Sequence, residues 1–284
     1  MNAARAALFS LSLLTLELGA SQVRDFWFNG AELNRYELTQ MRYGKPHPGH
    51  AELIFVTEPF LIDEQVKREF GNGPSTDVLK LNTLRTFNTG LYSYRTMTST
   101  FNSIELESYP HALKTNTTIQ DWCGQAFQQI KRRENSWAVE LRSYFQASGD
   151  QNIELADAWL EDELWVLLRL DPLKLPTGTF QVVPGAVHTR FTHLPIRSVS
   201  AEAKLFPDRK TSLYALRYES ISRTLEIEFD TAFPHVIRAW KEIGPDGSTI
   251  AKLTHRQMNV PYWSQNRQSD AEKRKALGLD PVAN

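Results

Sequence analysis

Side chains that could perform acid–base chemistry occur in four separate stretches of the sequence. Arg95 lies in LYSYRTM, Asp121 in QDWCGQ, Glu161 in LEDELW and His188 in AVHTRF. A hydrolase or lyase needs two neighbouring groups whose pKa values are pushed apart, as in glycoside hydrolysis by two carboxyl groups. If the chain is an enzyme, we expect these four residues to carry the reaction. Two further carboxylates could take part: Glu58 and Glu163.

The single cysteine, Cys123, lies in DWCGQAF. A thiolate nucleophile needs a helix N-terminus or a histidine cation beside it, and neither is near in the sequence. In an extended chain Trp122 and Gly124 fall on one side, and Cys123 and Gln125 on the other. Free cysteine is among the most buried residue types, so we expect a structural thiol inside a strand. One cysteine also excludes an intramolecular disulfide.

Histidines occur in two pairs, His47 with His50 in HPGH and His188 with His193 in HTRFTH. Both stretches are typical of loops rather than of a helix face that would gather ligands, so we expect no metal site. The sequence also contains no glycine-rich phosphate loop, G-x-S-x-G elbow or H-E-x-x-H. We therefore expect no cofactor.

The first 21 residues predict a secretory signal peptide. Arg5 is followed by an apolar run from Ala6 to Leu18 and then by the small residues Gly19, Ala20 and Ser21. The run is too short to span a membrane, and Glu17 within it would be costly in hydrocarbon. We expect an exported protein, periplasmic or envelope-associated and soluble after cleavage. A surface helix at the start of a cytosolic protein is the alternative.

Composition places the remaining residues, 22–284, in one globular domain. The chain of 284 residues is 41% hydrophobic and 11% aromatic, and 32 basic residues oppose 33 acidic ones. Because this balance creates no strong field, we expect no nucleic-acid partner.

Most of the chain has the period-two pattern of strands, over about residues 30–145 and 178–260. Hairpin turns are predicted at Asn88-Thr89-Gly90 and at Gly244-Pro245-Asp246-Gly247, and KPHPGH at 45–50 is predicted to be a break between strands. Leucines and Trp159 at helical spacing predict one amphipathic helix over 153–171, ended by Pro172. The tail predicts a short helix, capped by Ser269 or Asp270 and stopped by Gly278. We expect a mainly β fold: a single large curved antiparallel sheet or open barrel with one inserted helix.

At YELTQMRYG, LIFVTEPF, LKLNTLRTFNTGLYSYRTMTSTF and QDWCGQAF the sequence resembles a group of exported bacterial proteins and lipoproteins of unknown function. The resemblance covers most of the chain after residue 25, including LEDELW and LPTG. Some members carry the label septum formation inhibitor Maf, but the serine- and arginine-bearing S-x-S-x-R loop of genuine Maf proteins is missing near this N-terminus. The succession of strands is also similar to the open barrels of Lol-type lipoprotein carriers, a likeness of fold alone.

Two classes of function remain open. A binding protein would hold an apolar or amphipathic ligand in the concave face of the sheet, with helix 153–171 as the natural filler, or would support an envelope protein partner. The polar and aromatic side of strand 91–101, beside Asp121, Trp122 and Gln125, would line the ligand, although cross-strand packing explains these residues too. The expected ligand-binding residues are Tyr92, Tyr94, Thr98, Trp122 and Gln125. The second class is the hydrolase or lyase of exported polymers, glycan or ester.

Overall fold

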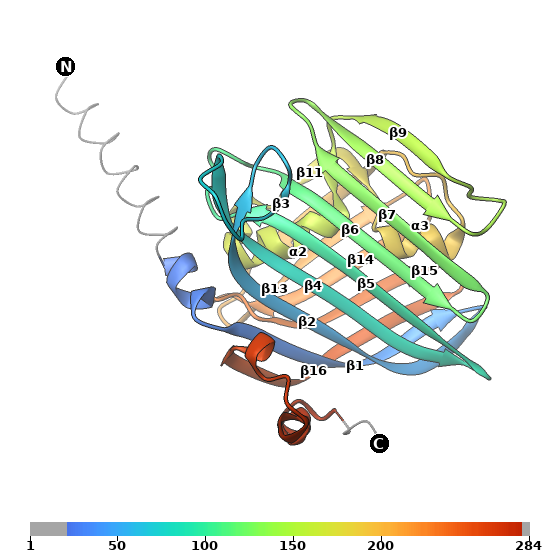
Figure 1. Ribbon diagram of the computed structural model, residues 1–284. Helices are drawn as coiled ribbons and strands as arrows, with labels where there is room; N and C mark the ends of the chain where they lie inside the picture. Colours follow the sequence, from blue (N-terminus) through green and yellow to red (C-terminus); the bar gives the residue numbers. More distant parts are fainter. Residues whose placement is uncertain (1–21, 280–284) are drawn as a thin grey trace, which may run out of the picture.

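A computed structural model describes residues 22–279, so the predicted signal peptide lies outside the described residues. Sixteen strands form one sheet that curls into an open barrel (Figure 1). The strands are β1 (Ala31–Arg42), β2 (Lys45–Leu61), β3 (Val66–Lys67), β4 (Ser75–Thr89), β5 (Tyr92–Ser103), β6 (Ala112–Asp121), β7 (Gly124–Arg132), β8 (Ser136–Ser143), β9 (Gln151–Ala156), β10 (Trp159–Leu160), β11 (Gly178–Val183), β12 (Val199–Phe206), β13 (Thr211–Tyr218), β14 (Arg223–Asp230), β15 (Ile237–Gly244) and β16 (Gly247–Val260). The predicted curved antiparallel sheet is confirmed.

Sheet order nearly follows chain order, with β16 returning to pair with β1. Neighbouring strands are antiparallel except β10 and β11. Within the described chain the hydrogen-bonded path ends at β9 on one side and β10 on the other, which leaves the barrel open along a seam. Apolar side chains pack at this seam, among them Trp137 of β8, Leu160 of β10 and Val183 of β11. The seam is therefore held by side-chain packing.

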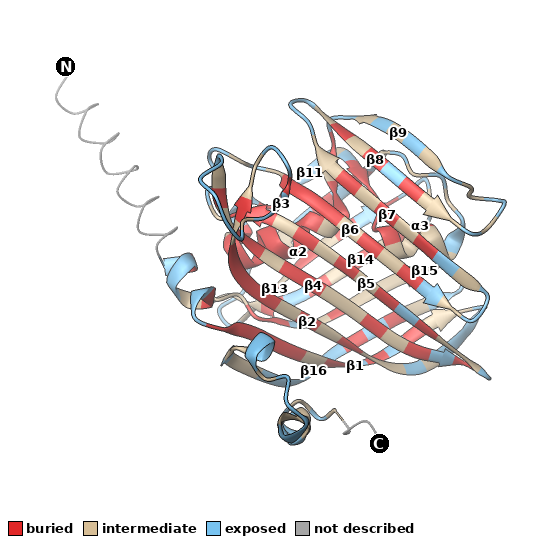
Figure 2. Cartoon of the chain, viewed as in Figure 1, coloured by how far each residue is buried: buried red, intermediate tan, exposed pale blue. Residues whose placement is uncertain are grey.

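Helix α2 (Glu161–Leu170) lies inside the barrel (Figure 2). Its residues Leu164, Val166, Leu167 and Leu168 are at most 1% exposed and belong to the main core, which joins them to inward residues of most strands. A curled sheet leaves a concave face that must be filled, and here a segment of the same chain fills it. The predicted inserted helix is confirmed.

The predicted bounds of this helix, 153–171, are wrong at the start. Residues 151–156 form β9, and only from Glu161 is the chain helical. Ile153 and Leu155 are half-buried and alternate with exposed Asn152 and Glu154, so the period-two pattern and pairing with β8 prevail over the helical spacing. The acidic residues Glu154 and Asp157 thus lie before the helix rather than in its first turn.

The remaining helical elements are short. They are residues 22–28, η1 (Pro172–Lys174), α3 (Ala186–Thr192), η2 (Tyr262–Ser264) and η3 (Gln268–Leu277). The predicted C-terminal helix is η3, and it ends at Gly278 with a left-handed φ of 61°, as expected. Its N-cap is Arg267, not Ser269 or Asp270; the Asp270 carboxylate accepts from the Arg267 backbone N–H. Helix α3 was not predicted from the sequence. None of the helices among residues 22–279 is long and apolar enough to cross a membrane.

Two of the three predicted turns are confirmed. Gly90 joins β4 to β5 with a φ of 63°, and Pro245-Asp246 joins β15 to β16. The predicted break at 45–50 is wrong, because β2 begins at Lys45 and the turn lies at Tyr43-Gly44. Strand β4 pairs with β2 only from Gly49 onward, so the prolines at 46 and 48 sit on a stretch with one free edge, where a missing N–H is tolerated.

A buried ion pair fixes the C-terminal end of α2. Arg169 and Glu32 of β1 are both fully buried, with 2.6 Å between Nη2 and Oε2. Trp27 Nε1 and Arg256 Nε also donate to the Glu32 carboxylate, each at 2.9 Å. Burial alone would raise the pKa of Glu32, but the two guanidinium charges outweigh it and lower the pKa to about 2.

Truncation of α2 tests whether it is the core of the barrel. Leu164→Ala should lower the free energy of unfolding by about 2–5 kcal/mol, because Leu164 is fully buried and the barrel cannot collapse onto the cavity. Leu173→Ala is the matched control, since Leu173 is 85% exposed and should change stability by no more than about 0.5 kcal/mol. Urea unfolding of both variants is the measurement, and equal effects would contradict the role given to α2.

Candidate functional site

A pocket of about 140 Å³ lies where α3 approaches the tips of the β1–β2 and β15–β16 hairpins. Its mouth includes Arg42, Tyr43 and Asp246, and its inner part contains Arg85 and Glu242. A smaller hollow of about 30 Å³ continues toward the start of α2 and shares several of the same side chains. The combined space is small beside the roughly 300–1,000 Å³ of typical ligand pockets.

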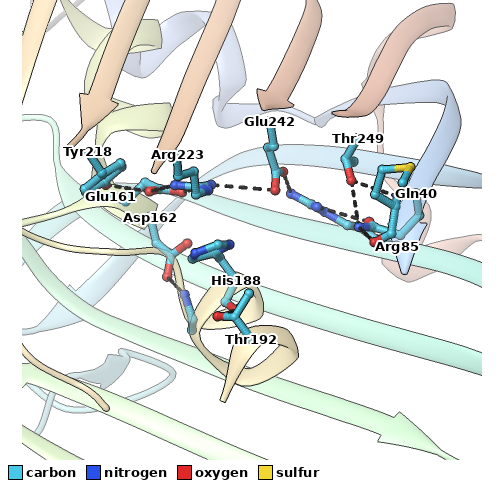
Figure 3. Close-up of polar contacts among 12 residues, drawn as sticks. Gln40, Arg85, Glu161, Asp162, His188, Thr192, Tyr218, Arg223, Glu242 and Thr249 are labelled. Carbon is cyan, nitrogen blue, oxygen red and sulfur yellow. Dashed lines mark hydrogen bonds and ion pairs between the residues drawn. The ribbon is translucent and has the colours of Figure 1, made fainter. Parts of the chain in front are cut away.

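The inner end holds four charged side chains in one row (Figure 3). Arg85 Nη2 of β4 lies 2.6 Å from Glu242 Oε1 of β15. Arg223 Nη2 of β14 lies 3.6 Å from Glu242 Oε2 and 2.7 Å from Glu161 Oε1 at the start of α2. The Tyr218 hydroxyl also donates to Glu161. Each carboxylate therefore has a guanidinium partner.

Strand alternation places these charges inside. Arg85 is on the same face of β4 as the core residues Leu79 and Leu81, and Arg223 is on the same face of β14 as Leu225 and Ile227. The inward row of each strand thus changes from apolar to charged as it approaches α3. Buried charges need partners, and the strands supply them to one another.

The guanidinium groups hold the neighbouring carboxylates ionised. Burial would raise the pKa values of Glu242 and Glu161, but Arg85 and Arg223 lower that of Glu242 to about 2, and Arg223 lowers that of Glu161. The same ion pairs outweigh burial at Arg223 and raise its pKa.

Asp162 and His188 lie beside this row and behave differently. Burial, and then the negative charge of Glu161, raises the pKa of Asp162 to about 7, although its Oδ2 accepts from the Ala186 N–H at 3.2 Å. Burial, and then the positive charge of Arg223, lowers the pKa of His188 to about 4. His188 Nε2 is buried without a hydrogen-bond partner. The imidazole is therefore uncharged at neutral pH, whereas the Asp162 carboxyl titrates in the neutral range.

The structure brings together two of the four expected catalytic residues. Glu161 and His188 line the inner hollow. Arg95 is exposed on β5, and Asp121 Oδ1 accepts from the backbone N–H groups of Cys123 and Gly124 in the β6–β7 turn. Arg95 and Asp121 line neither hollow, so the four residues do not form one site.

The two further carboxylates have structural partners. Glu58 pairs with Lys80 at 2.8 Å. Glu163 accepts from the backbone N–H groups of Leu160 and Ala112, and His111 Nδ1 lies 3.0 Å from it. Glu163 therefore caps the start of α2 and ties it to β6.

The expected ligand-binding residues separate into two groups. Thr98 lines the inner hollow, and Tyr94 is buried near the mouth, where its hydroxyl lies 2.7 Å from that of Tyr43. The Tyr92 hydroxyl donates to that of Tyr43 at 3.1 Å. Trp122, 69% exposed, and the exposed Gln125 belong to the β6–β7 hairpin and line neither hollow.

The expectation that Cys123 is buried in a strand is wrong. Cys123 is exposed in the two-residue turn between β6 and β7. The Asp121 carboxylate binds the turn N–H groups and so favours a tight turn where alternation alone indicates a continuous strand. The stretch with His188 and His193 is not the predicted loop, because α3 contains His188 and is capped by His193. Among residues 22–279, no group of three or more His, Cys, Asp or Glu is placed to hold a metal ion.

Four residues of the site were not identified from the sequence: Arg85, Asp162, Arg223 and Glu242. One signal was present, since Arg223 continues the apolar row of Leu225, Ile227 and Phe229 at period two. A charge on the apolar face of a strand indicates either a buried partner or a site, but the sequence does not identify the partner.

The raised pKa of Asp162 has a consequence for stability. Between the ordinary value of 3.8 and about 7 the folded state holds a proton that the unfolded state has lost, so this group makes stability fall as pH rises through that range. Asp162→Asn should remove this contribution, which amounts to up to about 1.4 kcal/mol per pH unit. Glu228→Gln, on the exposed side of β14, is the control. Urea unfolding should be measured from pH 3.8 to about 7 for the wild type and both variants. The free energy of unfolding of Asp162→Asn should fall less with pH, or rise more, than that of the wild type or Glu228→Gln. Identical pH dependence in all three proteins would contradict the raised pKa of Asp162.

Comparisons with known proteins give similarity to a solved structure and no match to a family model or a curated protein. No family model and no curated protein matches the chain. Among solved structures, it is similar to a β-barrel-like protein of the domain of unknown function DUF1849 from Brucella abortus. The TM-score is 0.48 at 10% sequence identity, over 82% of this chain and 99% of that chain.

Proposed function

We propose that the chain is an exported, envelope-associated binding protein that holds a small amphipathic ligand in the pocket beneath α3. The observation that carries this proposal is the combination of a charged inner end and apolar walls in one hollow at the rim of the barrel. The walls include Met41, Val187, Phe191 and Ile243. Binding sites of this kind combine a mostly apolar lining with a few polar groups that fix orientation.

The rest of the concave face offers less room for a ligand. Helix α2 and its apolar neighbours occupy it, as the buried fractions of Leu164 and Leu168 indicate. A long lipid chain would have to displace this helix. The ligand we propose is therefore small and enters only the end of the barrel.

The mouth of the pocket is held in place by aromatic and arginine contacts. Arg42 Nη1 donates to the Phe191 carbonyl at 2.6 Å, and its guanidinium lies 4.2 Å from the centre of the Tyr43 ring. Tyr94 stacks on Phe87 at 5.0 Å and meets the Phe191 ring edge-on at 5.5 Å. These contacts tie α3 to two hairpin tips, so the site is formed before a ligand arrives.

The exported location rests on the N-terminal pattern of cation, apolar run and small residues, and on the resemblance to exported bacterial proteins. An envelope protein partner is compatible with the same location.

Blocking the pocket tests the proposal. The wild-type chain, purified from the envelope fraction of its host, should carry a small molecule that mass spectrometry detects after denaturation. Val187→Trp should abolish this capture, because the indole fills the space between α3 and the inner charges. Val66→Trp on β3, where Val66 is 43% exposed, is the matched control and should retain the ligand. An empty wild-type protein, or equal capture by both variants, would overturn the proposal.

A second candidate is the hydrolase or lyase of exported polymers. The observation in its favour is the pair of adjacent carboxyls, Glu161 and Asp162, whose pKa values are moved in opposite directions beside His188. In this role Asp162 would act as the acid or base near neutral pH.

An activity assay separates the two candidates. A glycan and ester panel should show turnover that Asp162→Asn reduces by about 10²-fold or more if Asp162 transfers the proton. Glu228→Gln is again the control. Absence of turnover by the wild-type chain, or full activity of Asp162→Asn, would rule out this mechanism.

A further inference from the structure

We infer that the end of the ligand that enters this pocket is uncharged and both donates and accepts hydrogen bonds, as a hydroxyl or a primary amide does. The inference rests on the proposed function, because it names the chemical class of ligand for that same pocket. Two independent features carry it: the balance of charge around the two hollows, and the pairing of donors with acceptors at their inner end.

The positive charges of the guanidinium groups that line the two hollows are nearly balanced by the negative charges of the carboxylates. The cations are Arg42, Arg85 and Arg223, and three carboxylates lie opposite them, those of Glu161, Glu242 and Asp246. The raised pKa of Asp162 lets this carboxyl hold a proton in the neutral range, and His188 is uncharged there. A charged group brought into such a site would add a net charge away from water, which is unfavourable without a new partner.

Each inner charge already has a partner of opposite sign, and the Nε atoms of Arg85 and Arg223, which have no hydrogen-bond partner, are buried. Glu242 is bound by Arg85 at 2.6 Å and approached by Arg223 at 3.6 Å, and Arg223 is bound to Glu161 at 2.7 Å. A carboxylate in the ligand would compete with Glu242 for these guanidinium groups. An ammonium group would compete with them for Glu242.

Donors and acceptors lie next to each other at the inner end. Arg85 Nη1 donates to Gln40 Oε1 at 3.3 Å, and Gln40 Nε2 donates to the Thr249 hydroxyl at 2.9 Å. All three side chains line the pocket together with Glu242, whose side chain keeps 13% of its surface exposed. A carboxylate only accepts and an ammonium only donates, whereas a hydroxyl or amide does both. The inner end is thus matched to a neutral polar group, with the hydrocarbon part of the ligand against Met41.

Four compounds with the same carbon chain test the inference: butanamide, butanol, butanoate and butylammonium. Calorimetry on the full chain at about pH 6 keeps Asp162 mostly protonated and His188 mostly neutral. Butanamide or butanol should bind at least about tenfold more tightly than both charged compounds. Equal or tighter binding of a charged compound would overturn this inference and leave the proposed function standing. Binding by none of the four, together with an empty wild-type protein, would overturn the proposed function and the inference with it.

A variant changes the selectivity in a defined direction. Glu242→Gln removes one carboxylate from between two guanidinium groups, so butanoate should gain at least about tenfold in affinity relative to butanamide. Glu228→Gln removes a carboxylate from the exposed side of β14 and should leave the ratio unchanged. An unchanged ratio in a folded Glu242→Gln protein would overturn the inference. If Glu242→Gln does not fold, the wild-type series decides alone.

Discussion

Helix α2 can occupy the interior of the barrel because a buried ion pair holds each of its ends. At its start Glu161 is bound by Arg223, and at its end Arg169 is bound by Glu32, all four side chains being almost fully buried. Loss of one partner of such a pair typically costs about 3–5 kcal/mol, since the other charge is left without compensation. The apolar middle of the helix supplies contact area, and the charged ends fix its position along the barrel axis. A shift of one turn would separate both pairs.

The pocket follows from this arrangement. Glu161 must be buried to bind Arg223. The inward side chains of the strands are therefore charged near α3, whereas further along the same strands they are apolar. Asp162, one residue later, then lies beside an ionised carboxylate and away from water, which is why its pKa rises while that of Glu161 falls. The burial of Glu161 against Arg223 thus both anchors the helix and determines the chemistry of the candidate site.

Patterns of period two predicted most of the fold from the sequence. The alternation in RTLEIEFD and the Gly-Pro-Asp-Gly turn led to β14 and to the β15–β16 hairpin. Errors arose where a local signal had two solutions. Leu155 lies four residues before Trp159, at helical spacing, and two residues after Ile153, at strand spacing, and pairing with β8 decides between the two. The turn at Cys123 depends on the Asp121 side chain rather than on alternation.

The site was less predictable than the fold. Glu161 and His188 were singled out by residue type, but Arg85 of β4 lies far in the sequence from Arg223 and Glu242 of the consecutive strands β14 and β15. No spacing within one element relates β4 to β14 and β15, because four pairings separate β4 from β15 in the sheet and their inner faces meet only when it has curled. Residue type indicates the chemistry available to a side chain, and the curvature of the sheet determines which side chains lie close enough to form one site.

The seam between β9 and β10 gives the barrel an unequal stiffness. Around most of the barrel, an increase in circumference would require the backbone hydrogen bonds between two neighbouring strands to break together. At the seam the two margins meet through apolar side chains such as Val183 and through the hydrogen bond from Trp137 Nε1 to the Ala158 carbonyl, so parting them breaks few bonds to peptide groups. We therefore expect the barrel to widen along this seam rather than at the opposite wall, where β16 pairs with β1.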